Sequence, residues 1–269
     1  MEWFEGIKRG NNMKFTVDAK EFVKSLTDIQ LKGKYVKGAS VTNGSLVEYF
    51  YAKLYNNTLS LWNADAINSL IVKVNLTVDG EEDGVFVAET ETLLKYLKKF
   101  SGDVEINSND IITMTNGSSK VTQPIVVNHP NMDAINRMGQ YVLDTHFEEN
   151  LETLFKFNKS KFEGAFQLDS NTFSETMKLC ELIGSGVYHL NYEHDKNKLS
   201  MSSATNNTNK FETSIELEGN IGESATLDFS SPLHVLFDNE MLNFYVKDDF
   251  PMLIMSENKL IIKAPHLAN

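Results

Sequence analysis

The chain has 269 residues, of which 41% are hydrophobic and 23% charged, and its formal net charge at pH 7 is −12. This composition excludes a disordered or collagen-like chain, and the single cysteine excludes a disulfide framework and a cysteine-based zinc site within one chain. No window approaches 18 uninterrupted apolar residues, so we expect no transmembrane helix, and the first residues lack the basic and apolar stretches of a signal peptide.

The negative charge is concentrated in the second half of the chain. Residues 1–127 hold 14 basic and 16 acidic side chains, whereas residues 128–269 hold 11 and 21. An acidic chain is normally a poor nucleic-acid binder, because phosphate contacts need Lys or Arg. Any role on DNA must therefore depend on a local basic surface or on something other than affinity.

Most of the sequence alternates polar and apolar residues over short stretches separated by Asn, Asp, Gly and Ser turns, which predicts many short strands. The clearest predicted strands cover residues 104–107, 111–115, 187–192, 198–202 and 259–263. Four stretches show the helical period instead: residues 19–30, 89–101, 170–184 and 231–238. In the last of them, Ser230 or Ser231 suits the N-cap and Pro232 suits the first turn.

The first and third predicted helices begin with the same pattern, repeated after 151 residues. The two copies are Phe15-x-Val17-Asp18-x-x-x-Phe22 and Phe166-x-Leu168-Asp169-x-x-x-Phe173. In each copy a strand runs into an aspartate that can cap the following helix. The repeat predicts two similar β-rich domains with two helices each.

Between the copies lies a long stretch with little periodicity, which we interpret as a connector with an extra strand near 154–157. The predicted organisation is an N-terminal extension (1–12), a first domain (13–127), the connector (128–161) and a second domain (162–269).

Several segments carry local patterns that point to one family. These segments are Met13–Phe22, Leu59–Asp65, Tyr245–Ile254 with its Lys-Asp and Pro before a strand, and Lys259–Leu267 with its Ala-Pro tail. Together with the doubled unit, they resemble the two-domain DNA sliding clamps of the PCNA family. The chain departs from the family in its longer connector and in a short fourth helix without lysine.

The resemblance implies an α+β fold of two similar β-rich DNA-clamp (processivity) domains, each with two helices lining a ring and with sheets outside. It implies a homotrimer that encircles double-stranded DNA non-specifically and serves as a sliding clamp, or polymerase processivity factor, in DNA replication and repair. Retention by topology needs little phosphate affinity. The implied partners are DNA polymerase, other enzymes with clamp-binding peptides and a separate clamp loader ATPase. The implied location is inside the cell, and no membrane is implied as a partner.

The resemblance also implies which residues face the DNA. They are Lys20, Lys24, Lys95, Lys98, Lys99 and Lys178. A second interpretation stays open, because acidic residues share these helices and lysines at the end of a helix are favoured by its dipole in any case.

A groove beneath the connector is implied as the binding site for partner peptides. Its residues are Ala64, Ile67, Pro251, Ile262, Ala264 and Pro265. An apolar pocket would take aromatic anchors while the tail backbone pairs with the peptide. The alternative for each residue is ordinary core or turn packing.

No motif indicates catalysis, a cofactor or a metal. Gly184-x-Gly186 lacks the third glycine of a phosphate-binding loop, and His189 and His194 are expected on opposite sides of a strand. Cys180 lies on an apolar helical stripe and is predicted to be a buried thiol. We therefore expect no enzyme. The alternative to a clamp is a non-enzymatic β-rich structural or binding protein, such as a viral assembly component, whose repeat reflects duplication alone.

Overall fold

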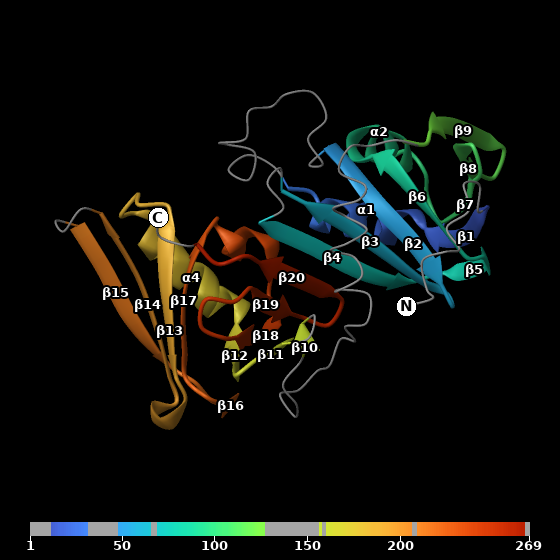
Figure 1. The fold of residues 1–269 in the computed structure, drawn as a ribbon. Helices are drawn as coiled ribbons and strands as arrows, with labels where there is room; N and C mark the ends of the chain where they lie inside the picture. The colour runs from blue at the N-terminus through green and yellow to red at the C-terminus, as the bar shows by residue number, and fades with distance from the viewer. Residues whose placement is uncertain are drawn as a thin grey trace. The chain divides into compact units, whose positions relative to one another are not determined.

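A computed structural model of the chain describes residues 12–31, 48–65, 69–126, 156–157, 160–205 and 209–266. The chain divides into two compact units, one of Met1–Ile67 with Val72–Ile135 and one of Asn68–Ile71 with Asn136–Asn269. Both units consist mainly of strands (Figure 1). Among the described helices, none has the length and apolar character needed to cross a membrane.

Unit 1 contains two sheets, with strand orders β5-β1-β7-β8-β9 and β4-β3-β2-β6. The first two residues of β4 belong to unit 2. The elements are β1 (Met13–Asp18), α1 (Ala19–Asp28), β2 (Tyr49–Tyr55), β3 (Thr58–Ala64), β4 (Leu70–Thr77), β5 (Asp79–Glu82), β6 (Gly84–Glu89), α2 (Thr90–Leu97), β7 (Asp103–Ser108), β8 (Ile111–Asn116) and β9 (Ser119–Pro124).

Unit 2 contains two sheets with orders β16-β12-β18-β19-β20 and β15-β14-β13-β17, and a small pair, β10-β11. The elements are β10 (Lys156–Phe157), β11 (Ser160–Lys161), β12 (Gly164–Asp169), α4 (Ser170–Glu181), β13 (Val187–Glu193), η3 (His194–Lys196), β14 (Lys198–Thr205), β15 (Asn209–Glu216), β16 (Asn220–Gly222), β17 (Ala225–Ser230), η4 (Leu233–Leu236), β18 (Met241–Val246), β19 (Met252–Met255) and β20 (Lys259–Lys263).

The two units repeat one topology. In the five-stranded sheets, β5, β1, β7, β8 and β9 correspond to β16, β12, β18, β19 and β20. In the four-stranded sheets, β4, β3, β2 and β6 correspond to β15, β14, β13 and β17. Helix α1 follows β1 as α4 follows β12, so the prediction of two similar β-rich units is confirmed.

Phenylalanines of the repeated pattern form the centre of each core. Phe15 and Phe22 are fully buried and meet edge to face, with ring centroids 5.9 Å apart. Their counterparts Phe166 and Phe173 both contact Phe244, at 4.8 and 5.2 Å between centroids. The pattern therefore serves to pack each helix against the strand that precedes it.

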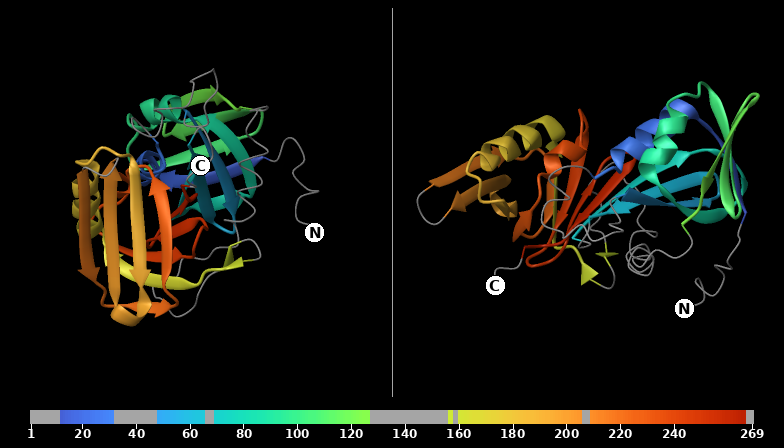
Figure 2. Two further views of the ribbon diagram at one scale, coloured as in Figure 1. Left: turned by 60° about the vertical axis from the view of Figure 1, so that its left-hand side comes forward. Right: turned by 90° about the horizontal axis from the view of Figure 1, so that it is seen from above.

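The three α-helices are shorter than predicted, and the prediction of a fourth helix over residues 231–238 is wrong. Residues 231–238 form only one 3-10 turn, η4, beside α4 (Figure 2). Pro232 occupies its N-cap position without a side-chain cap, Ser231 has a φ of 91°, and Phe237 after it is extended. Non-helical backbone on both sides prevents a longer helix from forming.

The predicted extension 1–12 and connector 128–161 lie largely outside the described residues, so their boundaries stay predictions. Within the described part of the connector, β10 lies where the extra strand is predicted.

Candidate functional site

Helix α1 presents two lysines on its exposed side. The Asp18 side chain caps it by accepting hydrogen bonds from the backbone N–H groups of Lys20 and Glu21, at 2.9 and 3.1 Å. Phe22 is fully buried, which fixes the inward face of the helix. Lys20 and Lys24, four residues apart, are both exposed and lie on one face of the helix.

Helix α2 packs beside α1 in unit 1 (Figure 2). Lys95 lies in its last turn, Lys98 is its C-cap residue and Lys99 follows. Its leucines are buried, while Lys95, Lys98 and Lys99 are exposed. The Glu89 carboxylate at its start accepts a hydrogen bond from the Thr92 hydroxyl, at 2.6 Å, and caps no backbone group. Acidic residues at the start and lysines at the end match the helix dipole, so this geometry fits both interpretations of the lysines.

Helix α4 of unit 2 carries one exposed lysine. Asp169 caps the helix by accepting a hydrogen bond from Thr172 N, at 3.0 Å. Lys178 is exposed, with Glu175 and Glu181 three residues before and after it. This spacing places both acidic residues on the same side of the helix as Lys178, so α4 has no basic surface of its own.

All six predicted DNA-facing lysines lack an ion pair with any described residue. By contrast, several lysines on strands and turns are paired with carboxylates. Examples are Lys14 with Glu81 at 2.7 Å, Lys247 with Glu163 at 2.5 Å, and Lys196 with Glu193. The helical ammonium groups are therefore available to an external anion.

On the second predicted surface, the loop that leads to Pro251 is anchored on both sides. The Asp248 carboxylate accepts a hydrogen bond from Thr226 N at 2.6 Å, and the preceding Lys247 is ion-paired. The ring of Phe250 meets Phe162 edge to face, with centroids 5.6 Å apart. Pro251 is left half-buried at the start of β19.

The C-terminal tail is held in place by two backbone hydrogen bonds. Ala264 N donates to Ser69 O at 2.8 Å, and His266 N donates to Asp228 O at 2.7 Å. Ala264 and Pro265 between them are half-buried. Pro251, Ala264 and Pro265 therefore offer partly accessible apolar surface in unit 2.

The other three residues predicted for the groove do not offer accessible surface among the described residues. Ile262 pairs with Leu253 and is only 4% exposed, which favours the core-packing interpretation for that residue. Ala64 is buried at the end of β3 in unit 1. Ile67 lies outside the described residues.

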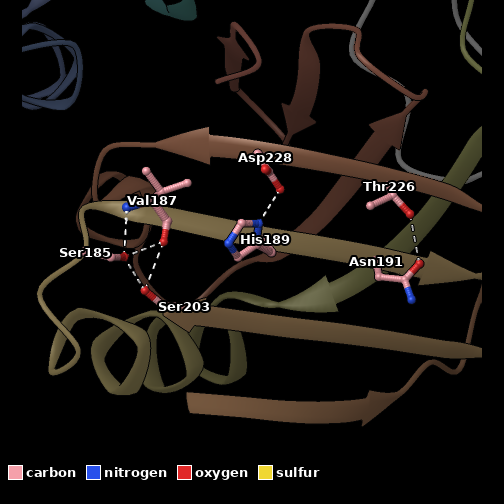
Figure 3. A network of polar contacts seen from close by, with 7 residues as sticks. All are labelled: Ser185, Val187, His189, Asn191, Ser203, Thr226 and Asp228. Atoms are coloured by element: carbon pink, nitrogen blue, oxygen red, sulfur yellow. Dashed lines mark hydrogen bonds and ion pairs between the residues drawn. The ribbon is translucent and has the colours of Figure 1, made fainter. Parts of the chain in front are cut away.

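A polar network on the four-stranded sheet of unit 2 was not predicted (Figure 3). His189 Nδ1 lies 2.5 Å from Asp228 Oδ1, and Thr226 Oγ1 donates to Asn191 Oδ1 at 3.1 Å. The alternation of these residues along β13 and β17 places them on one face, but the pairing of the strands cannot be read from sequence. His194 lies in η3 instead of on the strand. No group of three metal-ligating side chains occurs among the described residues.

Cys180 is fully buried in α4, as predicted. Burial raises the pKa of its thiol to about 11, because a thiolate would be poorly solvated there. The thiol is therefore protonated at neutral pH and is not an activated nucleophile.

No protein-family model matches the sequence, and no curated protein matches it. Solved structures do match. The chain aligns over its whole length with 69% of the DNA polymerase III beta subunit of Thermotoga maritima, at a TM-score of 0.73 and 14% identity. In addition, 96% of the chain aligns with 99% of A. fulgidus PCNA, solved with the C-terminal region of FEN-1, at a TM-score of 0.65 and 12% identity.

The chain has the fold of the DNA sliding clamps. A third match, the Helicobacter pylori beta clamp bound to a DNA ligase peptide, covers 96% of this chain and 67% of that one, at a TM-score of 0.67 and 10% identity. The predicted two-domain clamp fold is thereby confirmed. At these identities the similarity establishes the fold alone, and the function needs its own argument.

Proposed function

We propose that this protein is a DNA sliding clamp, a processivity factor that encloses duplex DNA and holds replication and repair enzymes on it. The observation that carries the proposal is the duplicated clamp topology, which extends over nearly the full length of a PCNA chain. Enclosure accounts for DNA binding by a chain of net charge −12, since retention then depends on topology and not on affinity. The role needs no catalytic group and places the protein inside the cell, with the DNA.

The unpaired helical lysines support this proposal. Only charges close to the duplex act on it, because the screening length is about 8 Å at physiological salt. Exposed ammonium groups on α1 and α2 can contact phosphates locally while the rest of the acidic surface disfavours non-specific binding.

Free sheet edges support a ring of identical chains. Strand β9 ends its sheet in unit 1 and β15 ends its sheet in unit 2, and neither has a described strand on its outer edge. We infer that β9 of one chain pairs with β15 of the next. Such head-to-tail contacts close into a ring, which we propose contains three chains.

The half-buried apolar residues Pro251, Ala264 and Pro265 are proposed to line the peptide groove. Clamps of similar fold were solved with a FEN-1 region and with a DNA ligase peptide. For this chain we propose as partners a DNA polymerase, other enzymes with clamp-binding peptides, and a separate loader that uses ATP.

Primer extension and retention on DNA test the function together. The protein, a clamp loader and the polymerase of the same source are combined on a primed circular template. We expect longer products per binding event than with polymerase alone. Protein loaded on nicked circular DNA should stay bound through gel filtration and be released once the circle is linearised.

A linear template with free ends provides the matched control, because a ring slides off it. Equal retention on circular and linear DNA would show binding without enclosure and would contradict the proposal. A protein that neither stays on circles nor stimulates the polymerase would favour the structural or binding alternative.

A further inference from the structure

The two copies of the repeat carry different charges at equivalent exposed positions. A shift of 151 residues places Asn171 on Lys20 and Glu175 on Lys24, and all four side chains are exposed. The caps and inward phenylalanines are the same in both copies, so the backbone presents the two positions in the same way. The first unit thus has two lysines where the second has an amide and a carboxylate.

The second helix of each unit shows the same difference. Unit 1 has α2 with Lys95, Lys98 and Lys99, whereas unit 2 has η4, which contains no lysine. The exposed side chain of η4 is Val235, at 59% exposure. The helix α4 beside it ends with Leu182 at 81% exposure. Four of the six exposed large hydrophobic residues in the described chain lie on α4, on η4 or at the start of β18.

The acidic residues do not remove this difference. Unit 1 has Glu21 and Asp28 on α1, which balance Lys20 and Lys24 in number, and Glu89 and Glu91 at the start of α2. The three lysines of α2 lie at the other end of that helix, so the basic region of unit 1 is centred there. In unit 2, the single Lys178 stands between Glu175 and Glu181. The helical side of unit 1 therefore has a basic region, and that of unit 2 is apolar with a slight acidic balance.

We propose, on the basis of the clamp function above, that unit 1 alone makes the phosphate contacts with duplex DNA. Each phosphate neutralised by a lysine releases condensed cations, so it contributes about 0.9 to the slope of log K against log salt. Unit 2 presents the duplex with apolar side chains and a slight excess of carboxylates, so it releases no condensed cations. In a ring of identical chains, basic segments then alternate around the DNA with segments that are not basic.

Exchanging residues between the copies tests this assignment. The first variant, Lys20→Asn with Lys24→Glu, gives unit 1 the residues of unit 2. The reciprocal variant, Asn171→Lys with Glu175→Lys, does the opposite, and Lys178→Ala removes the lone lysine of unit 2. Binding of a fluorescent 20-base-pair duplex is measured by anisotropy across a salt series, and thermal melting confirms that each variant is folded.

We expect the first variant to lower the slope by up to about 2, the reciprocal variant to raise it, and Lys178→Ala to leave it unchanged. An unchanged slope in the first variant, an equal loss with Lys178→Ala, or no measurable duplex binding by the unmodified protein would overturn the proposal. Retention on circular DNA is measured separately. If the protein encloses DNA but its units do not differ in phosphate contacts, only the assignment of these contacts to unit 1 is contradicted.

Discussion

Pro251 and Pro265 form the part of the proposed peptide groove that can be altered without disturbing the core, because both are half-buried whereas Ile262 is 4% exposed. Replacing both prolines with alanine removes apolar contact surface and leaves the strands intact. We expect affinity for a clamp-binding peptide from the polymerase of the same source to fall roughly tenfold, a loss of ~1–2 kcal/mol. Fluorescence polarisation with a labelled peptide measures this affinity.

His266→Ala is the matched control for this measurement. The His266 side chain is exposed, and its tail hydrogen bond to Asp228 O is made by the backbone N–H group, which the substitution keeps. The control should bind the peptide like the unmodified protein. Unmodified affinity in the double proline variant, with a normal melting temperature, would mean that peptides bind elsewhere.

The buried thiol of Cys180 makes the free energy of unfolding depend on pH. Its pKa is about 11 in the folded chain against an ordinary 9.0, so the unfolded thiol ionises first as pH rises. The stabilisation is complete below pH 9 and is lost between 9 and about 11, since the folded chain holds the thiol proton more tightly than the unfolded chain does. We expect the free energy of unfolding to fall by about 1 kcal/mol between pH 8 and 9.5.

Urea unfolding at these two pH values measures the effect, and Cys180→Ala provides the comparison. The variant lacks the thiol and should lose less stability over the same interval, although its absolute stability is lower. An equal pH dependence in both proteins would show that other groups cause it. Below the unfolding transition, the thiol should also resist thiol-reactive dyes at pH 8.

At the scale of elements, α2 allows the two interpretations of its lysines to be separated. Replacing Lys95, Lys98 and Lys99 with alanine removes favourable charges at the C-terminal end of the helix, which costs about 0.3–1 kcal/mol each under either interpretation. Only a DNA contact predicts, in addition, a lower salt slope in duplex binding and faster loss from circular DNA. A variant with reduced stability and unchanged DNA behaviour would leave these lysines with a purely helical role.

Elements that depend on local signals could be predicted from the sequence. The aspartates at 18 and 169 cap helices because a capping side chain needs only the next three backbone N–H groups. The exposure of the helical lysines follows equally from the 3.6-residue period. A longer helix was predicted at η4 because Pro232 suits a helix start, whereas the positive φ of Ser231 and the extended backbone of Phe237 have no local signal in the sequence.

Features that depend on strand pairing could not be predicted. The contact between His189 and Asp228 joins residues 39 positions apart on neighbouring strands, and only their register brings them together. The buried state of Ile262 likewise follows from its pairing with Leu253. The groove residues are distributed over a strand end, a loop and the tail, so periodicity carries no signal for them.

At the scale of the whole molecule, the repeated topology makes the assembly testable. If β9 pairs with β15 of the next chain, the exposed Lys120 on β9 meets a strand that carries Glu216 and Glu212, the latter paired with Lys210 of the same strand. Charge reversal at Lys120 therefore places like charges across the joint. We expect Lys120→Glu to weaken the ring roughly tenfold, because a charge at an interface rim alters association more than it alters folding.

Light scattering on a dilution series measures this effect. The unmodified protein should have about three times the 30.4 kDa mass of one chain and should dissociate only at low concentration. Lys161→Glu makes the same charge change at an exposed residue of β11, which belongs to neither edge strand, and should dissociate like the unmodified protein. Equal dissociation of both variants would place the subunit interface on other strands. A mass of one chain at all concentrations would contradict the proposed ring.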